Sequence, residues 1–528
     1  MIALDNMLKK KYTIIPVISI TIATGLTFFT LYYTSRRIKK IKNDNEARPN
    51  YKEIPSPEGA LPYFGHLFQV PTELPALKFD EWHKKYGPLI QIKMGVKPWI
   101  VIGDRQIAND ILKVRGAATS GRQYHIFLFE YYGLGQRAPA FTYPDKRWKK
   151  MRAAVMTAAG TKSVSSRMAS IEQESVVISN LLLNGTKEKG HVDVTKYMQL
   201  ASFNVIMQVC FGKSSKSVDD PLFVAVVDTI DTSVKWGAAA GDIRTFLPAF
   251  TKIFNLFMLR EKEMIDFTFK KRNPLFQNLI QEALESDQPS FVKHIYQVKE
   301  ENEFDDDDIL VLMVTAGTDT TGMTLAWSFV VLCHHKDVQD RLYHEIASFY
   351  AKHNRLPKYK DRENLPLLLS VQKECIRYRS TNHFPVPHES IKDFEYNGYF
   401  IPKGTLILSN TYTLNKSPDC YVNPEEFMPE RYIQDPTPIS VSLNSNVEKR
   451  DQYMFGWGRR ICPGVHLAEV ELFNFWVRIF ATSTIEPPLD NDTGLPVYPN
   501  LNSIHDAGIV VAPKYPNLRF IERSDRLV

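Results

Sequence analysis

A glycine-rich loop near the C-terminus holds one cysteine and runs directly into an apolar pattern with helical spacing. Residues 455–464 are Phe-Gly-Trp-Gly-Arg-Arg-Ile-Cys-Pro-Gly, so Cys462 stands where the helix is expected to begin. The glycines allow a tight turn whose backbone can approach a flat ligand, and the first amides of the helix point toward the sulfur. Arg460 adds positive charge two residues earlier. These features favour a thiolate that suits a metal ion, whereas a lone cysteine without them is usually a small buried filler.

The same loop resembles that of the cytochrome P450 haem-thiolate monooxygenases. Their pattern F-x-x-G-x-R-x-C-x-G is matched by Phe455, Gly458, Arg460, Cys462 and Gly464. The resemblance implies a mainly α fold with small β-sheets, the cytochrome P450 fold, preceded by one N-terminal transmembrane helix. It also implies haem b (iron protoporphyrin IX) as the cofactor. Cys462 would be the axial ligand of the iron, with Phe455, Arg460 and Gly464 at the haem.

A long apolar helix is predicted from residue 309 to about residue 333. Four consecutive acids at 305–308 suit its positive end, and apolar residues on nearly every side indicate burial in the centre of the fold. Within it, residues 316–321 (Ala-Gly-Thr-Asp-Thr-Thr) match the A-G-x-D-T motif of the same family. The resemblance assigns Asp319 and Thr320 to the handling of oxygen and protons. The structural alternative is a capped and kinked core helix, because buried Thr and Asp compete for backbone hydrogen bonds.

Another predicted helix, over residues 145–159, carries Trp148 and Arg152 four positions apart on one face. In the resembling family this W-x-x-x-R face meets a haem propionate. Many members also direct an arginine at a propionate from the position that His388 occupies in this chain. A histidine there can still donate a hydrogen bond, although its charge near neutral pH is less certain.

Three charged residues match structural motifs of the family. Glu374 and Arg377 form its E-x-x-R pair on a predicted helix, and Arg431 belongs to the later Pro-Glu-Arg element. We expect them to form a buried ion cluster with a structural role. Removing one member would leave an unpaired buried charge, which is costly.

The N-terminal region has the features of a membrane anchor. Residues 12–35 contain no charged residue and exceed the about 20 residues that a spanning helix needs. Basic residues cluster more heavily after this run than before it, which predicts a single-pass protein of the endoplasmic reticulum with a cytosolic body. A cleaved signal is the alternative, but the run is too long and lacks a cleavage site. The predicted division is a leader (1–11), a transmembrane anchor (12–35), a basic and proline-rich linker (36–65) and a catalytic domain (66–528).

The bulk composition excludes several other classes of protein. The 528 residues are 44% hydrophobic, and the net charge of +6 is spread along the chain, so no nucleic-acid partner is predicted. Five cysteines without close pairing predict neither a disulfide framework nor a zinc ribbon. The chain has no P-loop and no G-x-G-x-x-G between a strand and a helix, so it is not expected to bind a flavin or nicotinamide itself.

The resemblance implies an enzyme that inserts one atom of O2 into a lipophilic small molecule. Electrons would come from NADPH through NADPH-cytochrome P450 reductase, with cytochrome b5 as a further candidate donor. Lys146 and Lys150 lie opposite Trp148 on their helix, where they could dock an acidic donor or simply form a solvated face. The alternatives are a haem-thiolate isomerase or dehydratase and a non-catalytic haem-binding sensor. The retained Asp319 and Thr320 argue against both.

Smaller elements are also predicted. Two short strands, 89–93 and 99–102, should form a hairpin through Gly95, and Asn397-Gly398 should turn a second hairpin. The polar stretch 287–303 is interpreted as a surface loop.

Overall fold

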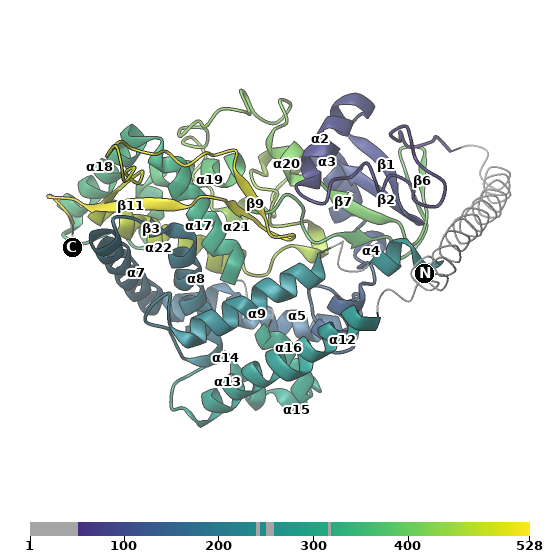
Figure 1. The fold of residues 1–528 in the computed structure, drawn as a ribbon, viewed down its shortest axis with the longest axis horizontal. Helices are drawn as coiled ribbons and strands as arrows, with labels where there is room; N and C mark the ends of the chain where they lie inside the picture. Colours follow the sequence, from purple (N-terminus) through teal and green to yellow (C-terminus); the bar gives the residue numbers. More distant parts are fainter. Residues whose placement is uncertain (1–50, 239–242, 250–257, 315–317, 528) are drawn as a thin grey trace, which may run out of the picture.

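The structure is a computed structural model that describes residues 51–238, 243–249, 258–314 and 318–527. The predicted anchor, residues 12–35, lies outside these ranges. Within them, no helix combines the length and the apolar character that crossing a bilayer requires. Figure 1 shows a mostly helical protein in which strands β1, β2, β6 and β7 lie together toward one end, while β3 and β11 lie among helices toward the other. The predicted class, mainly α with small β-sheets, is therefore confirmed.

The centre of the fold is helix α17 (Thr318–Cys333), which packs against α8 (Val194–Phe211) and α22 (Val465–Thr482). A Cβ at Gly322 would lie 2.9 Å from the Met198 carbonyl oxygen, so the close approach of α17 and α8 requires glycine there. Helix α16 (Asp306–Val314) precedes α17, and residues 315–317 between them are not described. The predicted buried helix is thus confirmed on both sides of that gap.

The other helices surround this centre. The α-helices are α2 (Pro75–Tyr86), α3 (Arg105–Ala108), α4 (Gly116–Thr119), α5 (Lys146–Ala159), α6 (Thr161–Ser166), α7 (Met168–Lys189), α9 (Pro221–Gly237), α10 (Ile243–Phe246), α12 (Met258–Asp266), α13 (Asn273–Glu285), α14 (Phe291–Gln297), α15 (Lys299–Asn302), α18 (Lys336–His353), α19 (Pro366–Tyr378), α20 (Thr411–Asn415) and α21 (Ile439–Ser442). The 3-10 and π segments are η1 (Asn109–Val114), η2 (Phe127–Tyr132), η4 (Phe267–Arg272), η5 (Tyr359–Asn364), η6 (Val447–Lys449) and η7 (Gly458–Arg460).

Four small sheets are formed by the described strands. The largest has the order β1 (Leu89–Met94), β2 (Lys97–Ile102), β7 (Leu406–Ser409), β4 (His388–Glu389). The others are β3 (Val192–Asp193), β11 (Asn517–Glu522) and β8 (Ser483–Glu486); β10 (Val511–Pro513) with β9 (Ile504–Asp506); and β5 (Phe394–Tyr396) with β6 (Tyr399–Ile401). Both predicted hairpins are confirmed, β1–β2 and β5–β6. The second turns through Asn397 and Gly398, which both have positive φ, as such tight turns demand.

The prediction of a surface loop over residues 287–303 was wrong. This stretch forms α14 and α15, although its composition is polar. The Ser290 hydroxyl accepts a hydrogen bond from the Lys293 amide and so caps α14, while Phe291, Val292 and Ile295 are buried beneath it. Three apolar residues on one face outweigh the charged residues that point outward.

Candidate functional site

The cysteine loop is closed by its own backbone. The Cys462 amide donates to the Phe455 carbonyl oxygen over 2.8 Å, and the turn η7 lies between the two residues. Gly458 has a φ of 54°, and a Cβ there would lie 2.5 Å from the Leu112 carbonyl oxygen, so no other residue fits without a backbone shift. Gly464 precedes α22 as its N-cap. The predicted order of tight loop, cysteine and helix is confirmed.

Cys462 is exposed by its accessible surface, yet enough protein atoms lie around its sulfur to shift the thiol pKa. Burial raises the pKa of the Cys462 thiol, and the Gly464 amide and the charge of Arg152 only partly oppose that effect. The Gly464 amide and the charge of Arg152 thus favour the thiolate, while desolvation opposes it. A metal cation would supply the missing positive charge and deprotonate the thiol that binds it.

Three arginines gather around this loop, and each donates its hydrogen bonds to backbone carbonyl oxygens. Arg460 bonds to Ser120 (2.9 Å), Pro139 (3.0 Å) and Thr142 (2.5 Å), Arg152 to Ile461 (2.6 Å), and Arg122 to Ala140 (2.8 Å), Val386 (3.1 Å) and Pro387 (2.9 Å). Within the described part of the chain, none of the three forms an ion pair with a carboxylate. The cluster thus carries positive charge that no neighbouring acid of these described ranges neutralises in direct contact.

Burial and mutual repulsion destabilise the charges of these arginines. Burial lowers the pKa of Arg122 well below its ordinary value, and the charges of Arg460 and Arg152 lower it further. Burial and the charge of Arg152 lower the pKa of Arg460 to about 9, against a weaker opposing effect of Asp145. Burial also lowers the pKa of Arg152. Grouping unpaired buried cations costs free energy unless an anion joins them. The donor set therefore fits a ligand that carries carboxylates.

Trp148 and His388 complete this cluster. The Trp148 indole N–H donates to the Pro139 carbonyl oxygen over 3.0 Å, and the Arg460 guanidinium lies 4.5 Å from the centre of the ring. His388, held in β4, places Nδ1 2.7 Å from the Thr119 carbonyl oxygen. Burial lowers the pKa of His388 well below its usual range, and the charge of Arg122 adds to the effect. His388 is therefore a neutral hydrogen-bonding group.

Asp319 is buried near the start of α17. The Gln199 side-chain amide of α8 donates to Asp319 Oδ1 over 3.3 Å, and the Asp319 residue is 8% exposed. Burial raises the pKa of Asp319 to about 6, and the negative charge of Asp231 on α9 raises it as well. The next residue, Thr320, is partly exposed, and its carbonyl oxygen accepts from Thr324 Oγ1 over 2.7 Å. A carboxyl group with this pKa can both hold and release a proton near neutral pH.

Glu374, Arg377 and Arg431 form one buried cluster. Glu374 accepts from Arg377 Nε over 2.7 Å and from Arg431 Nε over 2.9 Å, and its side chain is fully buried. Arg377 also donates to the carbonyl oxygens of Asn415, Pro424 and Glu426. Through these hydrogen bonds and ion pairs, the cluster links α19 to residues 415–431 at and after the end of α20.

The sequence analysis did not identify Arg122. It lies in the segment before η2, whose periodicity is weak, and a pair of backbone hydrogen bonds between Gly121 and Glu389 holds it beside β4. The sequence offered one hint of a special role for Arg122: no other lysine or arginine occurs between Arg115 and Arg137. The local sequence cannot show that this residue meets Arg460, which is more than 300 positions away.

The fold can be compared with those of known proteins, and the donor set around Cys462 fits a haem whose iron a thiolate binds. The family model described as Cytochrome P450 matches residues 55–502, most of the chain. The chain therefore belongs to the cytochrome P450 family, and it is a monooxygenase of that family.

Curated relatives and solved structures agree with this assignment. The chain is 28% identical over 435 residues to cytochrome P450 monooxygenase FrzL of Cladobotryum sp, a match that covers 81% of this chain and 80% of that protein. It is 26% identical to the trans-cinnamate 4-monooxygenase of Zinnia elegans, covering 84% and 88% of the two chains. A zebrafish cytochrome P450 structure with progesterone matches the fold with a TM-score of 0.69 at 23% identity, covering 85% of this chain and 99% of that one.

Proposed function

We propose that this enzyme inserts one atom of O2 into a lipophilic small molecule and reduces the other atom to water. Electrons would come from NADPH through NADPH-cytochrome P450 reductase, with cytochrome b5 as a further candidate donor. The observation that carries the proposal is the juxtaposition of Cys462 with three arginines, of which Arg122 and Arg460 are buried and Arg152 is half-buried, and none of which has a carboxylate partner in the described ranges.

The residues that would hold haem b follow from this arrangement. Cys462 would bind the iron, and Arg122, Arg152 and Arg460 would neutralise the two propionates. Trp148 keeps the Arg460 guanidinium in place through ring contact, and neutral His388 adds a hydrogen-bonding group beside it. Phe455 and Gly464 shape the loop around the sulfur. When bound, the haem iron supplies the activation of O2.

Asp319 and Thr320 are proposed to deliver protons. Because its pKa is about 6, the Asp319 carboxyl group can take a proton from solvent and pass it on without a large free-energy barrier. Gln199 fixes the orientation of Oδ1. Thr320 follows directly on the same helix, and its hydroxyl group would order a water molecule that continues the relay.

The test of ligation is the red-shifted Soret band of the reduced carbon monoxide complex. Cys462→Ala should lose this band, while Cys420→Ala should keep it, because Cys420 lies outside the loop. A Cys462→Ala protein that retains the band would refute the assignment of the thiolate. Consumption of NADPH in step with product formation, with reductase present, would distinguish a monooxygenase from an isomerase or dehydratase and from a haem-binding sensor.

We further propose that residues 12–35 anchor the enzyme in the membrane of the endoplasmic reticulum. The uncharged run and the heavier basic cluster after it support a single spanning helix with a cytosolic body. The leader (1–11), the linker (36–65) and the catalytic domain (66–528) keep the boundaries predicted from the sequence. The cytosolic orientation would bring the basic Lys146 side of α5 within reach of an acidic reductase, whereas Lys150 already pairs with Glu303.

A further inference from the structure

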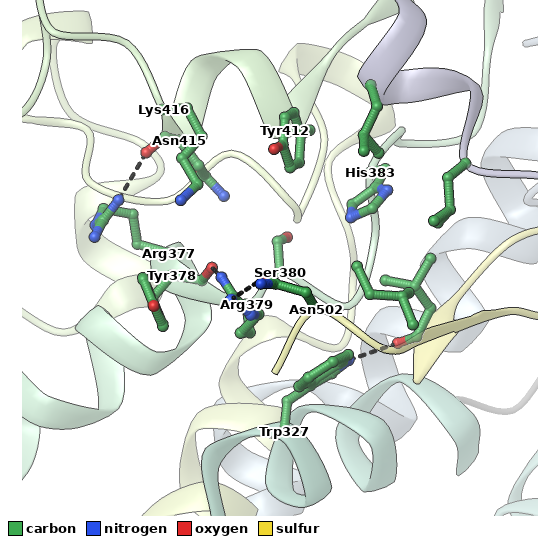
Figure 2. Close-up of a pocket in the computed structure, with 14 residues that line it drawn as sticks. Trp327, Arg377, Tyr378, Arg379, Ser380, His383, Tyr412, Asn415, Lys416 and Asn502 are labelled. Carbon is green, nitrogen blue, oxygen red and sulfur yellow. Dashed lines mark hydrogen bonds between the residues drawn. The ribbon is translucent and has the colours of Figure 1, made fainter. Parts of the chain in front are cut away.

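A second pocket lies outside the cysteine site, where the end of α19 meets α2, α20 and β9. Its volume is about 230 Å³, enough for one small organic molecule. Figure 2 shows Trp327 on one side, Tyr412 and His383 on the other, and Arg379 with Asn502 between them. The wall is therefore apolar and aromatic over part of its area and cationic at one place.

Among the described residues, no acid lines this pocket. Arg377, Arg379 and Lys416 all contribute to the wall. The acids nearby are bound elsewhere: Glu374 pairs with Arg377, Glu425 pairs with Lys416 and is mostly exposed, and Asp506 accepts from the Leu74 and Gly508 amides. Over the ranges that the structure describes, Arg379 is the cation in this wall that lacks a carboxylate partner.

The Arg379 guanidinium uses only part of its hydrogen-bonding capacity within the described part of the protein. It donates to the carbonyl oxygens of Leu501 (3.2 Å) and Tyr378 (3.0 Å) and to Asn502 Oδ1 (3.3 Å), all neutral acceptors. A guanidinium has five N–H donors, so two remain for another acceptor. Its carbon lies 4.2 Å from the centre of the Tyr378 ring, and Lys416 Nζ lies 5.1 Å from the same ring. The Arg377 guanidinium carbon lies 6.0 Å from that ring as well, so three cations share one aromatic neighbour.

The positive charges in this wall contribute to lowered pKa values of Lys416 and His383. Burial lowers the pKa of Lys416, and the charges of Arg379 and Arg377 lower it further against the opposing effect of Glu425. Burial lowers the pKa of His383 to about 4, with Asp506 opposing and Arg379 adding to the effect. His383 is therefore a neutral ring at physiological pH.

We propose that this pocket binds a small aromatic carboxylate, with Arg379 as its anchor. The carboxylate would accept the two remaining N–H donors of Arg379 as charge-assisted hydrogen bonds. The ring of the ligand would lie against Trp327, with the Tyr412 ring on the opposite side of the pocket. None of the residues that line this pocket belongs to the cluster around Cys462.

Benzoate is the probe, titrated into the full-length holoenzyme by isothermal titration calorimetry. Benzoate should bind saturably to one site, without a change in the Soret band, because the pocket does not include the iron ligand. Benzamide has the same ring but no charge, and it should bind at least about tenfold more weakly. This comparison needs no mutation.

Arg379→Gln should weaken benzoate binding at least about tenfold, while Arg341→Gln should leave it unchanged. Arg341 is an arginine of α18 that pairs with Glu430 at the surface. The absence of saturable benzoate binding would overturn the proposal. Equal affinities for benzoate and benzamide, equal affinities for wild type and Arg379→Gln, or a Soret shift that accompanies binding would each do the same.

Discussion

Replacing Asp319 with asparagine should stabilise the folded enzyme while impairing its chemistry. The folded protein raises the pKa of this carboxyl group from 3.8 to about 6. Each unit of pKa difference between the folded and unfolded states corresponds to about 1.4 kcal/mol. The raised pKa of Asp319 therefore lowers the free energy of unfolding by about 3 kcal/mol at pH 7. The asparagine side chain would have no charge to desolvate, and its oxygen can still accept the hydrogen bond from Gln199. Asp319→Asn should therefore recover most of that cost.

The sign of the effect sets its pH window. Because the folded state binds this proton more tightly than the unfolded state, the wild-type enzyme loses stability as pH rises from about 3.8 to about 6. Above that window the loss is complete. The advantage of Asp319→Asn should thus be small near pH 4, about half its full size at pH 5, and about 3 kcal/mol at pH 7.

The assay is thermal unfolding of the holoenzyme at pH 5 and pH 7. With about 2.1 cal/mol/K of unfolding entropy per residue, the midpoint should rise by about 3 °C at pH 7 and by about half of that at pH 5. Asp228→Asn on α9 is the control, since Asp228 forms an exposed ion pair with Lys271 and should change stability by less than about 1 kcal/mol. The reasoning fails if Asp319→Asn gains nothing at pH 7, or gains equally at both pH values.

Three further predictions address the chemistry, the ion cluster and the membrane topology. Thr320→Ala should keep haem and substrate binding but consume more NADPH per product, with the excess recovered as peroxide or water; unchanged coupling would make Thr320 structural. Glu374→Gln should lose about 3–5 kcal/mol in chemical denaturation because it leaves two buried arginines unpaired, whereas Glu430→Gln, which breaks the surface pair with Arg341, should lose no more than about 1 kcal/mol. The exposed sequon at Asn491 should carry no glycan in a cytosolic body, and a mobility shift on endoglycosidase treatment of cell-expressed protein would reverse the orientation.

The features that could be predicted from the sequence depend on local chemistry. Asp145 accepts from the Trp148 amide over 2.7 Å and caps α5, which begins within one residue of the start predicted from the sequence. Asn397 and Gly398 turn the β5–β6 hairpin for the same kind of reason. The ten-residue pattern around Cys462 also depends on neighbours in the chain, so its loop and helix could be foreseen.

The features that could not be predicted depend on contacts between distant segments. Arg122 joins the cysteine site only because Gly121 pairs with Glu389 across more than 260 residues. The raised pKa of the Cys462 thiol likewise reflects the atoms that surround it, which no local pattern encodes. The benzoate pocket combines α2, α19, α20 and β9, and its charge imbalance arises only when these elements are assembled.

The backbone acceptors of the three arginines have an evolutionary consequence. Every residue supplies a carbonyl oxygen, so most substitutions at Ser120, Pro139 or Thr142 leave the acceptor for Arg460 in place. A site built on side-chain partners would require paired mutations to survive sequence drift. The arginine site of this protein tolerates changes of sequence as long as the main chain keeps its path. This tolerance is consistent with membership of one family at only 28% identity to the FrzL monooxygenase.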